Sequence, residues 1–251
     1  MKKLIFALSI FALSFSAMQA QSGDFRFGFQ SSPTLSWMTT SVNYVNANGT
    51  IPGMKLGVIG EYYFRPDYAF IGGLGFAFNT GGRLLHAREG VYWTETEGKG
   101  IGRDTTAANS NLKYNLQYVE IPFGLKMRTR EFGYLRYFAE IPVFTLGFES
   151  TGRGTISAGT KVSEDPQAIE DLNIKSEINA LALSWGFGGG VEYSLSQNTS
   201  IVGGIFYQRY FTDITDDNGV NFPEPGNVSN TNENDEKTVI SNLTLRLGVM
   251  F

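Results

Sequence analysis

The fold expected for this 251-residue chain is decided by one stretch, VEIPFGLKMR at positions 119–128. Every odd-numbered position in it is apolar, whereas the even-numbered positions are charged, proline or glycine. A period of two is typical of a β-strand whose two faces meet different surroundings. Ten residues in a strand tilted by about 40° rise through roughly 25 Å, close to the height of the lipid-facing band of a membrane barrel. The alternation predicts that Phe123→Arg, on the lipid face, is costly and that Gly124→Ser, on the inner face, is milder.

The same alternation recurs along the chain. Seven further segments carry it, beginning near Phe25, Met54, Tyr68, Leu135, Leu181, Ser200 and Leu243. In six of them one face is clearly apolar. In segment 200–212 the sequence does not decide which face points outward. Eight alternating segments with glycine-rich second faces indicate eight strands of a single sheet.

The connections between these segments alternate in length. Short links fall at 65–67, 129–133 and 196–199, and long polar links fall at 39–52, 80–111, 149–176 and 213–236. Short turns on one side and long loops on the other are typical of outer-membrane barrels. The prediction is an all-β fold, an eight-stranded antiparallel up-and-down transmembrane β-barrel with short periplasmic turns and long extracellular loops.

The N-terminus has the pattern of a secretory signal peptide. Lys2 and Lys3 precede an apolar run at 4–15, and Ala20 is a plausible cleavage end before Gln21. The run is too short for a typical membrane-spanning helix. We therefore expect a signal peptide at 1–20, a mature barrel domain at 21–251, and a location in the bacterial outer membrane.

Composition excludes several classes of function. The chain contains no cysteine, which excludes disulfides and thiolate metal sites. Its formal net charge is −4, from 20 basic and 24 acidic residues. Without residues 1–20, which hold two lysines and no acid, 18 basic residues remain against 24 acidic, a net charge of −6. That sign argues against nucleic acid as a partner.

A soluble β-sandwich or a lipocalin-like barrel is the alternative fold. In such a protein the apolar faces would point inward and the charged faces outward. The belt-length strands, the many apolar-face Phe and Tyr residues and the glycine-lined second face favour the membrane barrel. The final residue, Phe251, favours it too, because an aromatic end on an alternating strand resembles the signal read by the outer-membrane assembly machinery.

One segment, YVEIPFGLK at 118–126, resembles the signature strand of the PorT-like outer-membrane β-barrel family of Bacteroidota. The Ala20-Gln21 end of the leader and the terminal Phe251 are similar to that group as well. The resemblance implies an eight-stranded barrel in the outer membrane and no single activity. One member of the family is associated with type IX secretion, so an accessory role in secretion is also implied.

An eight-stranded barrel has an interior that side chains can fill. The inner faces of the strands place several charged residues there, and neutralised carboxylates would form a structural plug rather than an ion path. The predicted lumen charge network consists of Glu61, Glu120, Lys126, Arg128, Arg136, Glu140, Glu192 and Arg246, and Lys55 is expected to face the same lumen.

The sequence names no catalytic residue. Its one histidine, His86, falls in the long 80–111 link, where a solvated loop residue is the plainer interpretation than a catalytic base. Trp93 in the same link suits either a binding surface or a cap over the barrel mouth. Calcium at 216–218 is conceivable, but the spacing does not match an EF-hand, so we expect no metal and no cofactor.

The expected function is that of a non-enzymatic barrel that anchors extracellular loops for binding. Its expected partners are outer-membrane lipid, the barrel-assembly machinery, and an envelope protein or surface ligand that meets the long loops. A lipid-modifying enzyme and a narrow channel are the alternatives. The sequence identifies neither the ligand nor the oligomeric state.

Overall fold

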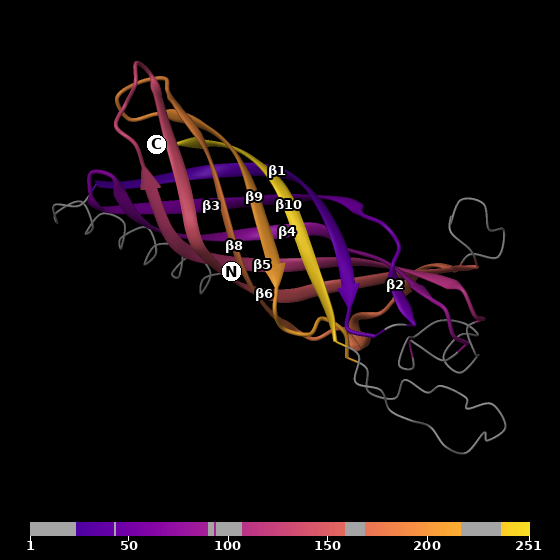
Figure 1. Cartoon of the computed structure of the whole chain (residues 1–251). Coiled ribbons are helices and arrows are strands. Elements are labelled where there is room, and N and C mark those ends of the chain that lie inside the picture. The colour runs from indigo at the N-terminus through magenta and orange to yellow at the C-terminus, as the bar shows by residue number, and fades with distance from the viewer. Residues whose placement is uncertain (1–23, 43, 90–92, 94–106, 159–168, 217–236) are drawn as a thin grey trace.

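The computed structural model describes residues 24–42, 44–89, 93, 107–158, 169–216 and 237–251. Long strands form the body of the molecule (Figure 1), and eight of them are longer than ten residues. They are β1 (Asp24–Thr40), β3 (Ile51–Arg65), β4 (Tyr68–His86), β5 (Ser110–Arg128), β6 (Leu135–Ala158), β8 (Leu181–Ser194), β9 (Ser200–Tyr210) and β10 (Thr238–Met250). Among the described residues, no helix has the length and apolar character needed to cross a membrane.

The eight strands close into a barrel. Each pairs antiparallel with its neighbours in chain order, and β1 pairs with β10 to join the first strand to the last. At this seam Phe29 lies opposite Val249, and the main chains of Phe27 and Phe251 exchange two hydrogen bonds of 3.2 and 2.8 Å. A closed ring leaves no strand edge with unpaired backbone groups, which a sheet surrounded by lipid requires. The predicted eight-stranded antiparallel barrel is confirmed.

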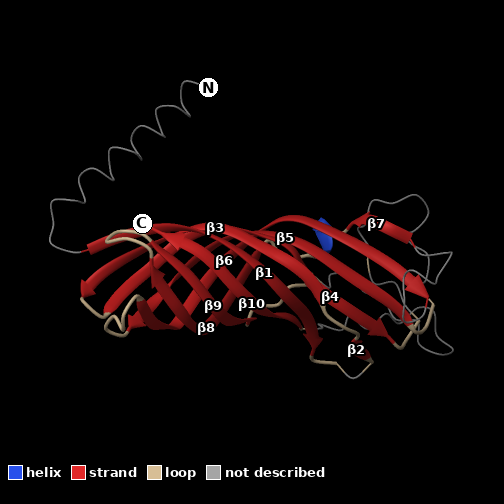
Figure 2. Ribbon diagram, turned by 90° about the horizontal axis from the view of Figure 1, so that it is seen from above, coloured by secondary structure: helices blue, strands red, loops and turns tan. Residues whose placement is uncertain are grey.

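The two ends of the barrel differ (Figure 2). At one, which we call the short-turn end, lie the links 66–67, 129–134 and 195–199 together with the last residue. At the other, the long-loop end, three short elements supplement the strands: β2 (Val45–Ala47), β7 (Ile169–Asn173) and the 3-10 turn η3 (Lys175–Glu177).

Three strands run further toward the long-loop end than the sequence predicted. β4 continues to His86, β5 begins at Ser110 and β6 continues to Ala158. The expected loops 80–111 and 149–176 therefore contain paired strand, with Leu84 opposite Leu112 and Leu112 opposite Ile156. Polar residues concealed the alternation there, because beyond the lipid band the outer face no longer has to be apolar.

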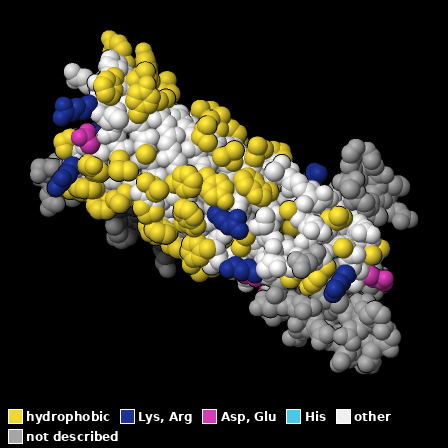
Figure 3. All heavy atoms as spheres, viewed as in Figure 1, with side chains coloured by type: hydrophobic (Ala, Val, Ile, Leu, Met, Phe, Trp, Pro, Cys, Tyr) yellow, Lys and Arg dark blue, Asp and Glu magenta, His cyan; other side chains and the backbone are white. Residues whose placement is uncertain are grey.

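The outer wall carries a band of exposed apolar side chains, which Figure 3 shows on one face of the molecule. The odd-numbered residues of β5 from 121 to 127 are exposed on the outer wall, and Phe123 is 46% exposed. The same holds around the ring for large side chains such as Phe29, Phe70, Phe76, Phe187, Ile205 and Leu247. β9, whose facing was open, also turns its odd-numbered residues outward, with Ile201 and Ile205 exposed and Val202 and Phe206 buried. An apolar band this extensive suits contact with hydrocarbon, since water would disfavour it.

Gly124→Ser meets a constraint that the alternation does not show, so we expect it to cost more than its place on the inner face suggests. A Cβ atom at Gly124 would lie 2.4 Å from the carbonyl oxygen of Pro142 and 2.9 Å from the Cα of Val143, both backbone atoms of β6. The β5–β6 register shifts between Gly124 and Lys126, and the β6–β8 register shifts between Glu140 and Val143. Gly124 therefore allows close approach of two irregular strands, a constraint that alternation does not reveal.

Candidate functional site

The half of the lumen nearer the short-turn end holds a first ion-pair group around Lys126. The ammonium group of this residue, which is 1% exposed, donates to Glu61 Oε1 at 2.5 Å and also to Glu192. Arg26 Nη1 lies 3.0 Å from Glu192 Oε2 and 3.8 Å from Glu61 Oε2. The hydroxyl of Tyr63 donates to Glu61 Oε2 at 2.7 Å. Two carboxylates and two cations thus neutralise one another away from water.

A second group lies around Glu120, which is 6% exposed. The Lys55 ammonium donates to both carboxylate oxygens of Glu120 at 2.8 and 2.9 Å, and to the side-chain oxygen of Gln208 at 2.6 Å. Tyr210 donates its hydroxyl to Glu120 Oε1 at 3.0 Å. The carboxylate is therefore bound from two directions, by β3 and by β9.

A third group pairs Arg246 with Glu140. One guanidinium nitrogen lies 2.7 and 2.8 Å from the two carboxylate oxygens, and the guanidinium carbon lies 3.6 Å from the centre of the Phe206 ring. Phe206 stacks on Phe138, over whose ring the Lys126 ammonium lies at 4.4 Å. Across the three groups, four carboxylates meet four cations, so these groups together are charge-balanced. Such satisfied networks hold a structure rigidly in place.

Six of the predicted network residues belong to these groups: Glu61, Glu120, Lys126, Glu140, Glu192 and Arg246. Arg128 and Arg136 do not. Arg128 donates to the carbonyl of Pro66 at 3.0 Å and stacks over Tyr63, while Arg136 pairs with Glu131 at 2.7 Å with 30% of its side chain exposed. Both lie where β5 and β6 approach the short-turn end, so they line the rim rather than the interior.

Sequence reasoning left Arg26, Tyr63, Gln208 and Tyr210 out of the network. Arg26 could have been found, because it alternates with outward Phe25 and Phe27 and so falls on the inner face. Tyr63 could have been found in the same way, because it shares the odd-numbered face of its strand with Glu61. Gln208 and Tyr210 could not, since the sequence does not decide which face of segment 200–212 points inward.

The half of the lumen nearer the long-loop end is filled by an apolar plug. Its members come from the long-loop ends of the strands and from residues between them: Met38, Val45, Leu84, Trp93, Leu112, Tyr114, Leu116, Leu172, Ile174, Ile178, Ile214 and Ile240. Trp93 stands edge-on to Tyr114 at 5.4 Å and donates its indole N–H to the Tyr114 hydroxyl at 3.3 Å. Of the two interpretations of Trp93, the structure therefore favours the cap over the barrel mouth.

His86 is not the solvated loop residue that the sequence suggested. It ends β4, beyond the last large apolar outward residue of that strand, Phe78, and therefore outside the lipid band. Its side chain is 3% exposed, and burial lowers the pKa of the imidazole to about 3. An imidazole with that pKa is neutral at pH 7 and a weak general base. The cause of the error is the length of β4, which extends into the predicted loop.

The described residues contain no group of three or more His, Cys, Asp and Glu side chains that could hold a metal ion. Of the three residues considered for calcium, Asp217 and Asn218 lie outside the described residues, as does the predicted signal peptide at 1–20.

The filled interior leads to a prediction about conduction. Purified protein in planar bilayers should show no stable large conductance, because the ion-pair groups and the plug occupy successive levels of the lumen. Single-channel recording over a range of voltages and salts measures this. Reproducible ion-selective steps that change with Glu120→Gln or Arg246→Gln would contradict the prediction and favour a channel.

Comparison with known proteins agrees with this architecture. A family model described as an outer membrane protein beta-barrel domain matches residues 19–216, more than three quarters of the chain. No curated protein sequence matches the chain.

Similar solved structures are outer-membrane proteins of low sequence identity. Neisserial surface protein A is 13% identical with a TM-score of 0.41, covering 89% of this chain and 95% of that one. The attachment invasion locus protein Ail of Yersinia pestis is 12% identical with a TM-score of 0.39, covering 91% and 99%. OprG of Pseudomonas aeruginosa is 11% identical with a TM-score of 0.42, covering 92% and 97%.

A closed eight-stranded barrel, an apolar band on its outer wall and the family match over residues 19–216 lead to the same conclusion. The chain belongs to the outer membrane protein beta-barrel domain family, and its place is the bacterial outer membrane.

Proposed function

We propose that this protein is a non-enzymatic anchor that holds its long-loop end outside the cell, where the loops bind an envelope protein or a surface ligand. The observation that carries the proposal is the interior, which is occupied at both levels. Near the short-turn end the four carboxylates are neutralised by four cations, and near the long-loop end the apolar plug closes the opening. A barrel built in this way offers a partner its loops and its outer wall.

The apolar plug also fixes residues from which the long links leave the barrel. Ile174 and Ile214, which follow β7 and β9 respectively, are fully buried among strand residues. Asp213 Oδ1 accepts hydrogen bonds from the amides of Thr215 and Thr238 at 3.2 and 2.9 Å, which ties the ends of the 217–236 link to the barrel. Loops that leave a rigid base can present a binding surface with little loss of conformational entropy.

Catalysis on lipids finds little support in the described residues. The one histidine of the chain is buried outside the lipid band with its pKa lowered to about 3, so it is poorly suited to activate a serine at neutral pH.

Export and assembly complete the proposal. The leader at 1–20 would direct the chain to the periplasm and be removed there. The Phe251 ring is 44% exposed on the outer wall at the short-turn end, 5.6 Å from the Phe27 ring, where the assembly machinery could read it. The resemblance of 118–126 to the PorT-like signature strand supports placing the chain in that group, with an accessory role in secretion as one form of the binding function.

The test replaces one long link and leaves the barrel intact. We expect a variant with residues 218–235 exchanged for a short Gly/Ser linker to lose a crosslinked partner that the wild-type protein retains in native outer membranes. Faster migration of unboiled samples on gels would show that both proteins are folded. A matched exchange of the short turn 195–199 should leave the crosslink in place. If replacing 218–235, 94–106 or 159–168 never alters the crosslinked species, loop-mediated binding is wrong.

A further inference from the structure

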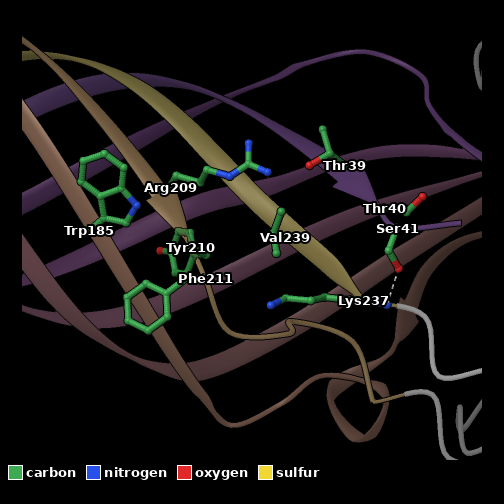
Figure 4. A pocket seen from close by; sticks show the side chains of 9 residues that line it. All are labelled: Thr39, Thr40, Ser41, Trp185, Arg209, Tyr210, Phe211, Lys237 and Val239. Carbon is green, nitrogen blue, oxygen red and sulfur yellow. Dashed lines mark hydrogen bonds between the residues drawn. The ribbon is translucent and has the colours of Figure 1, made fainter.

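The outer wall has a hollow at the upper edge of its apolar band. It is lined by residues of β1, β8, β9 and β10 and of the segments at their ends, and it has a volume of about 340 Å³ (Figure 4). Three of the lining side chains, Trp185, Arg209 and Phe211, are exposed on the outer wall. Six residues that matter for its chemistry line it: Thr39, Ser41, Trp185, Arg209, Phe211 and Lys237.

The position of the hollow along the barrel axis follows from the outward residues that lie between it and the short-turn end. Along β9 the outward side chains are Ile201, Ile205 and Tyr207 before Arg209 is reached. Along β10 they are Leu247, Leu245 and Leu243 at the level of the band, whereas Lys237 comes just before the strand begins. The two cations therefore stand where the apolar band ends, at the level of lipid headgroups, and Figure 3 shows Lys and Arg side chains along that boundary.

Four aromatic side chains of β1, β8 and β9 lie around Arg209 on the outer wall, and we call them the aromatic shelf: Trp37, Trp185, Phe187 and Tyr207. The four rings form a row in space. Neighbouring ring centroids are 6.3 Å apart for Trp37 and Tyr207, 5.8 Å for Tyr207 and Phe187, and 6.0 Å for Phe187 and Trp185. Trp185 lies opposite Arg209 in the β8–β9 pairing. Large amphipathic rings at this depth are suited to pack against the upper acyl chain and the glycerol or sugar of a lipid.

The two cations differ from every cation of the lumen. Arg209 and Lys237 are exposed, and within the described part of the chain neither forms an ion pair. The nearby acid Asp213 is directed to the backbone amides of Thr215 and Thr238. In Figure 4 the charged ends of Arg209 and Lys237 lie on either side of Val239. Two unpaired positive charges at one edge of the lipid band create a local preference for an anion.

Hydroxyl groups complete the lining. The Oγ1 atom of Thr39 is buried and has no hydrogen-bond partner among the described residues, which is unusual for a buried polar atom. The Oγ atom of Ser41 accepts a hydrogen bond from the amide of Lys237 at 3.2 Å and keeps its own proton available to donate. A guanidinium, an ammonium and two hydroxyls form a donor set that matches the oxygens of a phosphate group.

We propose that this hollow binds the phosphate group of an outer-leaflet lipid, with Arg209 and Lys237 contacting the phosphate and the aromatic shelf contacting the acyl end of the same molecule. A lipid-borne phosphate fits better than a free one, because the shelf contributes binding only to a ligand that carries an apolar part. The site is separate from the loop-mediated binding proposed above, since its lining residues lie on the strands or at their ends, outside the exchanged residues 218–235.

The test uses the full-length mature protein folded in phosphatidylcholine vesicles that contain a small fraction of bisphosphorylated lipid A. After gentle detergent extraction, native mass spectrometry counts the lipid A that stays on the protein. The wild-type protein should retain one molecule, and Arg209→Gln with Lys237→Gln should weaken retention about tenfold or more. The matched control is Arg83→Gln with Lys113→Gln, a cross-strand outward pair on β4 and β5 that changes net charge equally. This control should retain lipid A as the wild type does.

The other possible results of this experiment either support or overturn the proposed lipid phosphate site. Equal loss in both double variants would mean general attraction between charges and would overturn the site, as would unchanged retention in the Arg209 and Lys237 variant. Lipid A without its phosphates should bind as weakly to the wild type as intact lipid A binds to that variant. Displacement by millimolar inorganic phosphate would mean a site for the free ion and would overturn the lipid assignment. Unboiled gel migration of all variants shows that lost binding is not lost folding.

Discussion

Lys126→Met should lower the free energy of unfolding by about 3–5 kcal/mol, because it removes one partner from a buried ion-pair group. Glu61 and Glu192, each at most 2% exposed, would keep only Arg26 as a cationic partner. Urea unfolding of the barrel in phosphatidylcholine vesicles, followed by gel migration or tryptophan fluorescence, measures the change. Methionine keeps most of the volume of lysine, so the loss reports on charge rather than on a cavity.

Two variants control this result. Arg136→Met breaks an ion pair whose side chains are 30% and 33% exposed, and it should lower stability by no more than about 1 kcal/mol. Adding Glu192→Gln to Lys126→Met should recover part of the lost stability, because one of the two uncompensated carboxylates disappears. If Lys126→Met and Arg136→Met lower stability equally, the Lys126 group is not the buried network described here.

Phe123→Arg should lower the stability of the folded barrel in lipid by about 2–4 kcal/mol, since it places a charge near the middle of the hydrocarbon region. Gln117→Arg is the matched control. Gln117 lies on the same face of β5, six residues nearer the long-loop end, where the wall is no longer apolar. An arginine there should lower stability by only about 0–1 kcal/mol, because it reaches the interface.

A spectroscopic label separates the membrane barrel from a soluble one. A fluorophore at position 123 should be quenched by lipid-borne quenchers, whereas one at position 117 should be quenched more by aqueous iodide. Equal stability of the two arginine variants, or aqueous quenching at 123 in folded protein, would show that the apolar face does not meet lipid. Gly124→Ser is not a usable control, because its Cβ would collide with the backbone of β6.

Much of the fold could be predicted because its signals are local. Alternation along each strand sets which residues face outward, as VEIPFGLKMR does for 119–128. The lengths of the links separate one end of the barrel from the other. Both signals arise because lipid contacts one face of every strand and water surrounds both ends, so neighbouring residues carry the information. Where lipid contact ceases the signal disappears, and there the strand limits at His86, Ser110 and Ala158 were missed.

Contacts across the barrel depend on strand register and tilt, which no local pattern encodes. Lys126 meets Glu192 from two strands along the ring, 66 positions later in the sequence, and Arg246 meets Glu140 at a separation of 106. Arg136, on the same inner face, instead reaches Glu131 at the rim. The alternation therefore identified which side chains enter the lumen, whereas the closed sheet decided their partners. It also assembled Arg209, Lys237 and the aromatic shelf from four strands, because only ring closure brings β1 beside β10.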